Sequence, residues 1–262
     1  MDPHLFTLIN ASGLGFLLLL ETQASVFRRV LYDPRRMRRN LAFLIANIGA
    51  VLLLHRIVAY LTPLVPKLVW QAPLWLQLPL VFLLAELLNW VLHWAKHENA
   101  YLWRFHCQHH KEDQYSVWLT AHTYAPEVLL SGTVIASAVL MSGCSQLALD
   151  VYLLFYSLAN FYQHSALPHS LGILDKLIVN PAYHRHHHAG ARVNFSSTLT
   201  VWDWVFRTAR WPKHRRELLN PPAIDRTPEP FGFVDEMLYP LKPSRWAEGQ
   251  VLATKRANDF SS

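Results

Sequence analysis

The chain has 262 residues, of which 52% are hydrophobic and only 16% charged. The apolar residues fall in long blocks, which excludes an ordinary soluble core and indicates an integral membrane protein. Two cysteines exclude a disulfide framework. The net charge of +6 does not predict nucleic-acid binding, because the arginines lie beside apolar blocks, where membrane topology accounts for them.

Four apolar regions follow one another along the chain. Residues 5–26, 40–61 and 68–94 each come near the roughly 20 residues that a helix needs to cross a bilayer. The fourth region, residues 128–161, is interrupted at 141–146. It therefore predicts a helical hairpin whose two arms enter and leave on the same side of the membrane. Each arm is slightly short, so it either spans the bilayer or dips deeply into it.

Arginines set the expected orientation. Six of them crowd the loop between the first two blocks, namely Arg28, Arg29, Arg35, Arg36, Arg38 and Arg39, whereas the second loop has only Lys67. Because positive residues stay on the cytoplasmic side, we expect the first loop in the cytoplasm and the third block to end there near His93. Residues 260–262 carry no ER retrieval signal, which favours a bacterial inner membrane over the endoplasmic reticulum.

Fifteen histidines are the unusual feature of the composition, and four clusters hold most of them. The clusters are His93 with His97; His106 with His109 and His110; His164 with His169; and His184 with His187 and His188. Spacings of three and four residues place side chains on one face of a helix. The predicted topology puts every cluster on the cytoplasmic side, so we expect them to meet at or near the membrane surface.

Such a set of imidazoles predicts a metal site. Imidazole nitrogen suits iron, copper, zinc and nickel. Eight to ten histidines exceed the four ligands of a structural zinc and are enough for two ions with open positions. Removing hydrogen from an alkyl chain needs an oxidant that no side chain provides, but that a dioxygen-activating metal cofactor does. His186 is expected to point away from this site.

The clusters lie in motifs that resemble a known family. Residues 86–97, 102–110 and 180–188 are similar to its histidine boxes, the second almost residue for residue, and residues 194–195, 202–208 and 231–233 continue the match. From about Glu86 to Gly232, the chain resembles the fatty acid hydroxylase and sterol desaturase superfamily of membrane di-iron enzymes. It departs from the family pattern at His122 and Tyr124, where Arg and His are usual, and at Arg207, where the family has glycine.

The resemblance implies a ligand set by position: His93, His97, His106, His109, His110, His164, His184, His187 and His188, with His169 as a candidate tenth. It also implies two iron ions as cofactor, dioxygen as co-substrate and a lipid substrate whose tail reaches the metals from the bilayer. The chain has no haem, flavin or iron–sulfur motif. A separate electron donor is therefore expected, namely a small haem or iron–sulfur carrier with its reductase.

Two carboxylates are candidates for supporting the ligands. Glu86 lies two turns before His93 on the same helix face, within an apolar block, and is expected to accept the second ring N–H of a ligand histidine. Asp203 is the other candidate, with a helix-capping or surface role as the alternative. His122 is expected to support the site from behind the ligands rather than to bind metal.

We therefore expect an all-α, polytopic membrane protein with four or five membrane helices, including the hairpin, and a cytoplasmic helical metal-binding cap. Residues 1–66 would form N-terminal transmembrane helices and residues 67–211 the catalytic domain with the third span and the hairpin. Residues 212–262 would form a Pro-rich cytoplasmic cap and tail.

The leading functional hypothesis is hydroxylation of a lipid C–H bond by a non-haem di-iron oxygenase. A desaturase would use the same ligands, and the sequence does not separate the two reactions. A metal transporter would need polar residues across several spans, whereas the first two blocks have almost none apart from Glu21, His55 and Arg56. A zinc hydrolase would need fewer histidines and usually a carboxylate ligand. The class of lipid stays open.

Overall fold

The computed structural model describes residues 2–23, 34–61, 63, 72–111, 115–167, 171–190, 192–211, 234 and 237–241. Over these residues the fold is all-α, as predicted, and the one pairing of extended backbone is an isolated bridge between Ile178 and Leu199. Most of the predicted Pro-rich cap and tail lies outside the described residues, and so do the motif at 231–233 and His169.

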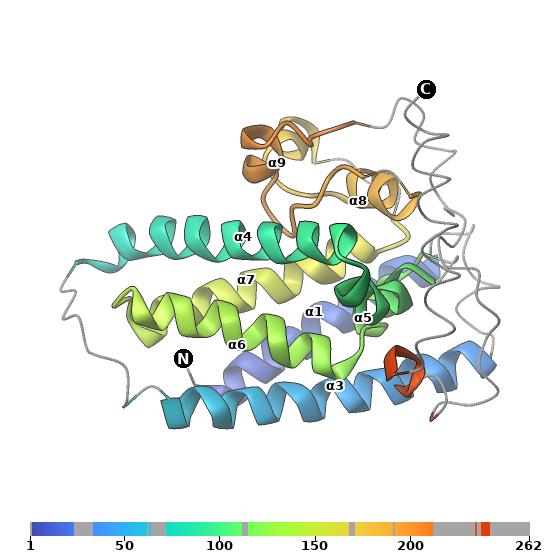
Figure 1. Ribbon diagram of the computed structural model, residues 1–262, viewed down its shortest axis with the longest axis horizontal. Coiled ribbons are helices and arrows are strands. Elements are labelled where there is room, and N and C mark those ends of the chain that lie inside the picture. The colour runs from blue at the N-terminus through green and yellow to red at the C-terminus, as the bar shows by residue number, and fades with distance from the viewer. Residues whose placement is uncertain are drawn as a thin grey trace.

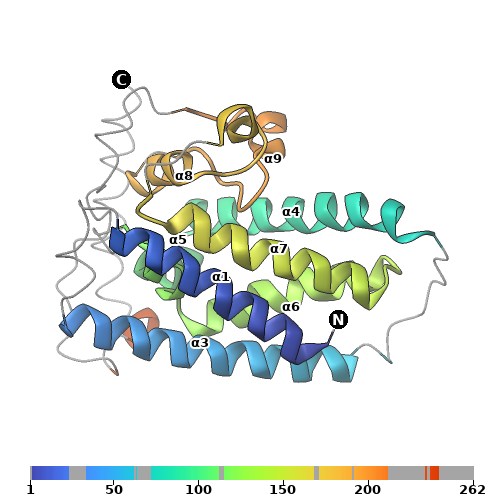
Figure 2. The ribbon, with the colours of Figure 1, turned by 180° about the vertical axis from the view of Figure 1, so that it is seen from behind.

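Five long helices run side by side as a bundle (Figure 1). They are α1 (Pro3–Gln23), α3 (Pro34–Leu61), α4 (Leu74–Glu98), α6 (Ala125–Met141) and α7 (Gln146–His164). The predicted hairpin is present as α6 and α7, whose connection lies at the end of the bundle opposite to α5 (Ala100–Lys111) and α8 (Pro181–His188). Viewed from behind, α1 lies on the near side of the bundle, beside α7, against which it packs (Figure 2).

Three helices in the described part of the chain are long and apolar enough to cross a membrane. They cover His4–Gln23, Met37–Leu61 and Leu74–Glu98, close to the three blocks predicted first, whereas Ala125–Met141 is apolar but shorter. The third helix begins after Pro73, continues through Pro79 and extends to Glu98, four residues beyond the predicted end. His93 and His97 therefore belong to this long helix.

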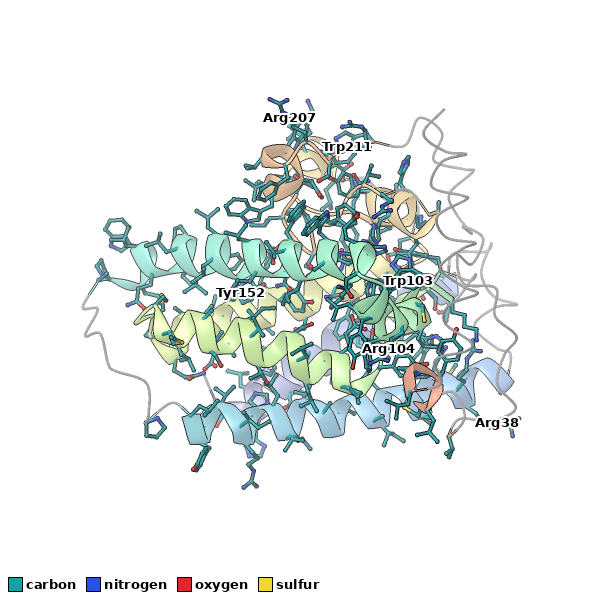
Figure 3. All side chains as sticks on the ribbon, viewed as in Figure 1. Arg38, Trp103, Arg104, Tyr152, Arg207 and Trp211 are labelled. Carbon is teal, nitrogen blue, oxygen red and sulfur yellow. The ribbon has the colours of Figure 1, made fainter. Side chains whose placement is uncertain are left out.

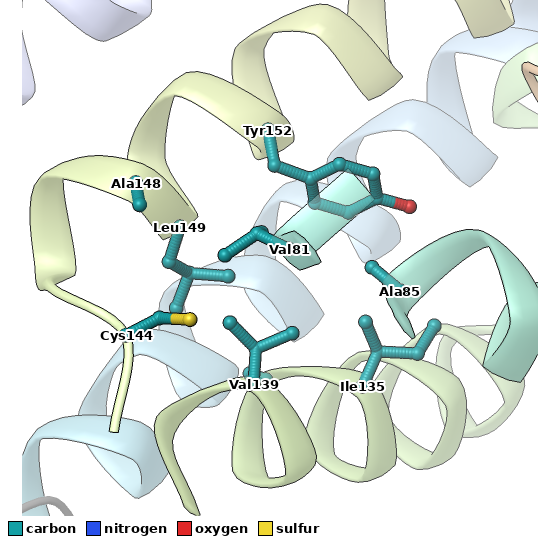
Figure 4. Close-up of a cluster of buried hydrophobic side chains, with 9 residues drawn as sticks. Val81, Ala85, Ile135, Val139, Cys144, Ala148, Leu149 and Tyr152 are labelled. Carbon is teal, nitrogen blue, oxygen red and sulfur yellow. The ribbon is translucent and has the colours of Figure 1, made fainter. Parts of the chain in front are cut away.

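The bundle core is a cluster of small and medium apolar side chains between α4, α6 and α7 (Figure 4). Its members include Val81 and Ala85 of α4, Val139 of α6 and Leu149 of α7. Tyr152 closes the cluster towards the histidines, with its hydroxyl hydrogen-bonded to Glu86. This core holds the ends of α4 and α7 at fixed positions, and both ends carry histidines.

Glu21 anchors loops at the histidine end of the bundle. One of its carboxylate oxygens accepts hydrogen bonds from the backbone N–H of Val117, at 2.9 Å, and of Ala166, at 2.6 Å. The side chain is fully buried near the end of α1. A buried amide without a partner is costly. Glu21 thus ties α1 to the 3₁₀ turn η2 (Val117–Ala121) and to the segment after α7.

Glycines allow two helix pairs to approach closely. A Cβ atom on Gly132 of α6 would collide with a methyl carbon of Leu54 on α3, whereas one on Gly49 of α3 would meet no atom within 4 Å. Gly13 of α1 is similarly crowded by Leu158 of α7. Small residues are typical of close helix contacts in membranes.

We expect Gly132→Val to destabilise the bundle and Gly49→Val to leave it nearly unchanged. Overpacking a tight contact costs about 1–3 kcal/mol, whereas both substitutions change helix propensity alike. Thermal unfolding of both variants in the same detergent or nanodisc measures the difference. Equal melting temperatures would contradict a tight contact between Gly132 and the side chain of Leu54.

Candidate metal centre

Four helices bring the clustered histidines together at one end of the bundle. His93 and His97 lie one turn apart on α4, and α5 carries His106, His109 and His110. α7 ends at His164. α8 carries His184, His187 and His188; it starts with Pro181, and the side chain of Asn180 caps it by accepting the N–H of Tyr183.

The nine described histidines of the predicted ligand set form two groups. Within each group, one ring nitrogen per residue lies within 4.8 Å of the others. The first group contains His93, His97, His106, His110 and His187, and the second contains His109, His164, His184 and His188. Sequence neighbours are divided between the groups: His109 and His110 belong to different groups, and so do His187 and His188. No carboxylate belongs to either group in the described part of the chain.

The Nε2 atoms of the second group point at one another. The Nε2 atom of His164 lies 3.1 Å from that of His109 and 3.0 Å from that of His184, which is 3.2 Å from that of His188. In the first group, the Nε2 atom of His110 is 3.2 Å from those of His106 and His187. Ring centroids of His110 and His188 are 4.3 Å apart, so the two groups are adjacent.

Hydrogen bonds on the outer side of the rings fix the tautomer of several histidines. A carbonyl oxygen only accepts, so an Nδ1 atom facing one must carry the proton and leave Nε2 with a lone pair. The Nδ1 atoms of His93, His164 and His187 donate to the carbonyls of Phe195, Asn160 and Val193, respectively. The lone pairs therefore point into the groups.

This donor arrangement fits a bound metal. The inward lone pairs of His164 and His187 lie about 3 Å from neighbouring ring nitrogens, so a cation bound between the rings would find several nitrogen donors at once. A metal–imidazole bond of about 2.1 Å places neighbouring nitrogens about 3 Å apart when they subtend a right angle at the ion. The Nε2 atom of His97 is buried without a hydrogen-bond partner, which is the state of an unsatisfied ligand.

Burial keeps the imidazoles of α5 and α8 neutral. Desolvation, followed by the neighbouring histidines, holds the pKa of His109, His110, His184 and His188 well below the ordinary value. Burial likewise lowers the pKa of His187 to about 3. Neutral imidazole is the form that binds metal, so these rings need not lose a proton to do so at neutral pH.

Glu127 supports His106 and was not among the predicted site residues. Its Oε1 atom accepts from Nδ1 of His106 at 2.9 Å and from Nζ of Lys96 at 2.7 Å. A carboxylate on the outer nitrogen orients an imidazole and raises its basicity as a ligand. The sequence contained a signal for it, because Glu127 is a carboxylate in the first turn of an apolar helix.

Asp203 connects four parts of the site. It lies in the short helix α9 (Val201–Val205), is fully buried and accepts five hydrogen bonds. The donors are Trp90 Nε1, the Tyr183 hydroxyl, the Thr208 hydroxyl and the backbone N–H groups of Phe195 and Ser196. Phe195 in turn accepts from His93. Asp203 thus positions a histidine of the first group through the backbone, and its burial excludes a surface role.

The prediction that Glu86 accepts a ring N–H from a ligand histidine is wrong. Glu86 accepts instead from the Tyr152 hydroxyl and from the backbone N–H groups of Thr198 and Leu199. Two helical turns separate Glu86 from His93 by about 10 Å along the axis, so sharing a face does not bring them into contact. Glu86 thereby holds the segment that follows Phe195 against α4.

The remaining polar residues singled out in the sequence lie outside both groups. The Nε2 atom of His122 lies 2.6 Å from the side-chain nitrogen of Gln108, and its ring packs on Phe43. His186 belongs to neither group, as expected. The backbone of Arg207 has a φ angle of 60°, which lies in the left-handed region that favours glycine. This conformation explains why the family pattern has glycine at this position.

Comparisons with known proteins agree with the motifs. The model of the fatty acid hydroxylase family matches residues 78–208, half of the chain. An alkylglycerol monooxygenase of Homo sapiens is 28% identical over 44% of this chain and 26% of its own length. A very-long-chain aldehyde decarbonylase of Oryza sativa subsp. indica is 28% identical over 47% of this chain and 21% of its own length.

An ornithine lipid hydroxylase of Rhizobium tropici is 27% identical over 54% of this chain and 44% of its own length. The matched part of the chain thus spans less than half the length of each of these relatives. No solved structure matches the chain significantly.

We expect Asp203→Asn to destabilise the protein strongly. The amide nitrogen would face at least one N–H donor, and each buried polar group left without a partner costs about 1–3 kcal/mol. Asp150→Asn on α7 is the control, because Asp150 bonds Gln146 at the surface. Thermal unfolding should show a loss of several degrees for Asp203→Asn only. Equal melting curves would contradict the role of Asp203 as an anchor.

Proposed function

We infer that this chain, which belongs to the fatty acid hydroxylase family, is a membrane-bound non-haem di-iron oxygenase that hydroxylates a C–H bond of a lipid. The observation that carries the proposal is the pair of adjacent groups of buried histidines at one end of an apolar helical bundle. The names of the relatives support the reaction class, since two of them are a monooxygenase and a hydroxylase of lipids.

The donor set favours iron over a structural zinc. The first group offers five imidazoles, one more than tetrahedral zinc accepts, and two adjacent groups suit a pair of ions. We propose that the first group holds one iron and the second group the other. Bound iron would supply the dioxygen activation that attack on an unactivated C–H bond requires.

The protein's own residues would orient the ligands and exclude water. Four histidines donate their Nδ1 protons to fixed acceptors, which are the carbonyls of Phe195, Asn160 and Val193 and the carboxylate of Glu127. These bonds hold each ring so that its Nε2 atom keeps its direction. All nine ligand candidates except His97 are buried, and His97 is partly buried. A dry site strengthens every electrostatic interaction inside it and prevents side reactions.

The topology supports a cytoplasmic location for the site. α3 begins at the same end of the bundle as α5 and α8, with Arg38 near that end (Figures 1 and 3). Because arginine-rich loops stay in the cytoplasm, we propose that this end faces the cytoplasm and that the hairpin enters from it. A separate electron-donor protein would then reach the site from the cytoplasm.

A lipid desaturase is the second candidate, because the same histidines serve both reactions. A metal transporter is disfavoured by the placement of the histidines. The two groups lie together at one end of the bundle, whereas transport sites need ligands near the middle of several spans.

Three consecutive histidines of α8 offer a matched test of metal binding. We expect the purified chain to bind two irons and His186→Ala to keep both. His187→Ala should weaken the first group and His188→Ala the second, which falls from four ligands to three. Each substitution should lower the affinity of its group for iron by at least about a hundredfold. Even the replacement of a residue that only orients a metal ligand costs about 10–100-fold. Metal analysis after dialysis at defined free iron measures it; unchanged iron content in all three variants would contradict the site.

A lipid mass comparison tests the reaction. Cells that contain the intact chain and a competent electron donor should hold a lipid heavier by one oxygen atom, absent from cells with His109→Ala. A lipid lighter by two hydrogens would make the protein a desaturase instead. No difference, with the metal content of the intact chain established, would count against lipid oxidation while leaving the metal site in place.

A further inference from the structure

Two short segments outside the bundle form one unit, here called the lateral lobe (residues 171–179 and 199–207). It contains the 3₁₀ turn η3 (Gly172–Lys176) and the helix α9. The bridge between Ile178 and Leu199 joins the segments, and the N–H of Thr200 donates to the carbonyl of Leu177 at 2.9 Å. The lobe lies beside α4, away from the other bundle helices (Figure 1).

The lateral lobe exposes large apolar side chains next to one another in sequence. Ile173 is 81% exposed, Val205 57% and Trp204 53%. The other exposed apolar residues of the lobe are Leu171, Leu174, Leu177 and Phe206. Isolated exposed apolar residues are ordinary, but a gathering of this kind marks a surface that contacts a partner or a membrane.

The lobe continues the surface that α4 presents to lipid. Trp202 donates its indole N–H to the carbonyl of Leu83, near the middle of α4. The ring of Phe206 stacks on Trp90 at 4.1 Å, and Trp90 stacks on Trp94, which is exposed on α4. The lobe therefore lies alongside a candidate membrane span, at the level of its second half. An apolar surface at this level meets the bilayer rather than bulk water.

The exposed charges of the lobe are all basic. Its two acidic residues, Asp175 and Asp203, are buried, whereas Lys176 and Arg207 are exposed. Figure 3 shows Arg207 at the outer edge of the molecule, away from the bundle. Arg207 has a left-handed backbone, in which glycine would be unstrained, so the cation lies here despite the strain.

We propose that the lateral lobe inserts into the leaflet on the histidine side of the membrane as an interfacial element. Ile173, Trp204 and Val205 would lie among the acyl chains, and Lys176 and Arg207 would contact anionic headgroups. Apolar tips with a basic fringe are the composition of segments that lie in the membrane interface. This inference needs the membrane spans but not the proposed reaction.

Depth-dependent quenching tests the insertion. A fluorescent probe is attached at Ile173→Cys in the full chain, reconstituted in vesicles that contain nitroxide-labelled lipid. Leu52→Cys, on the exposed side of α3, is the lipid-facing control, and Arg192→Cys is the water-facing control. The native Cys107 and Cys144 are buried, and the labelled unsubstituted chain gives the background.

We expect lipid nitroxide to quench the Ile173 probe as it quenches the Leu52 probe, with iodide ineffective. Strong iodide quenching, as at Arg192, would overturn the proposal. Protection from both quenchers that is lost on dilution would also overturn it, because a second copy of the chain would then cover the lobe.

The basic fringe is tested with Arg207→Gly and Lys176→Gln, read by the same probe. Arg207→Gly relieves the strained backbone, so misfolding is not expected. In vesicles containing anionic lipid, each substitution should lower the ratio of inserted to exposed lobe by about fivefold, and in neutral vesicles by much less. Equal ratios in both kinds of vesicle, for parent and variants, would overturn the contact with anionic headgroups.

Discussion

Nine buried imidazoles with converging ring nitrogens set the main constraint on this structure. Polar ring nitrogens shielded from water are costly to bury, so the surrounding protein must hold them in place. The bundle does so with rigid parts: the end of α4, the end of α7, and the short helices α5 and α8. The apolar core beneath them prevents either long helix from sliding.

Buried carboxylates provide hydrogen-bond acceptors for the backbone N–H groups of the segments between the α-helices. Glu21, Glu86 and Asp203 each accept two backbone N–H groups from residues outside the α-helices. Amides in such segments have no helical partner, and water is scarce beside an apolar bundle. Each carboxylate therefore joins a bundle helix or α9 to a loop, and the loops carry or brace the histidines.

Much of the site could be predicted from local sequence, because spacings of three and four residues fix a helix face. The sequence could not predict that His109 and His110 belong to different groups, or that His187 and His188 do. This assignment depends on how α5 and α8 face each other. Glu86 was misassigned because a shared face says nothing about distance along the axis. The partners of Glu127 and Asp203 are 21 to 113 residues away in several cases, beyond the reach of any local pattern. Helix ends were predicted to within a few residues, except at the start of the second and third spans.

The α6–α7 hairpin reaches the histidine end at its two bases, where Glu127 lies in the first turn of one arm and His164 ends the other. Its tip lies at the far end of the bundle. Adding or removing whole turns in both arms would leave the directions of Glu127 and His164 nearly unchanged, because a turn returns a helix close to the same face. The arms can therefore differ in length while the groups at their bases keep their positions.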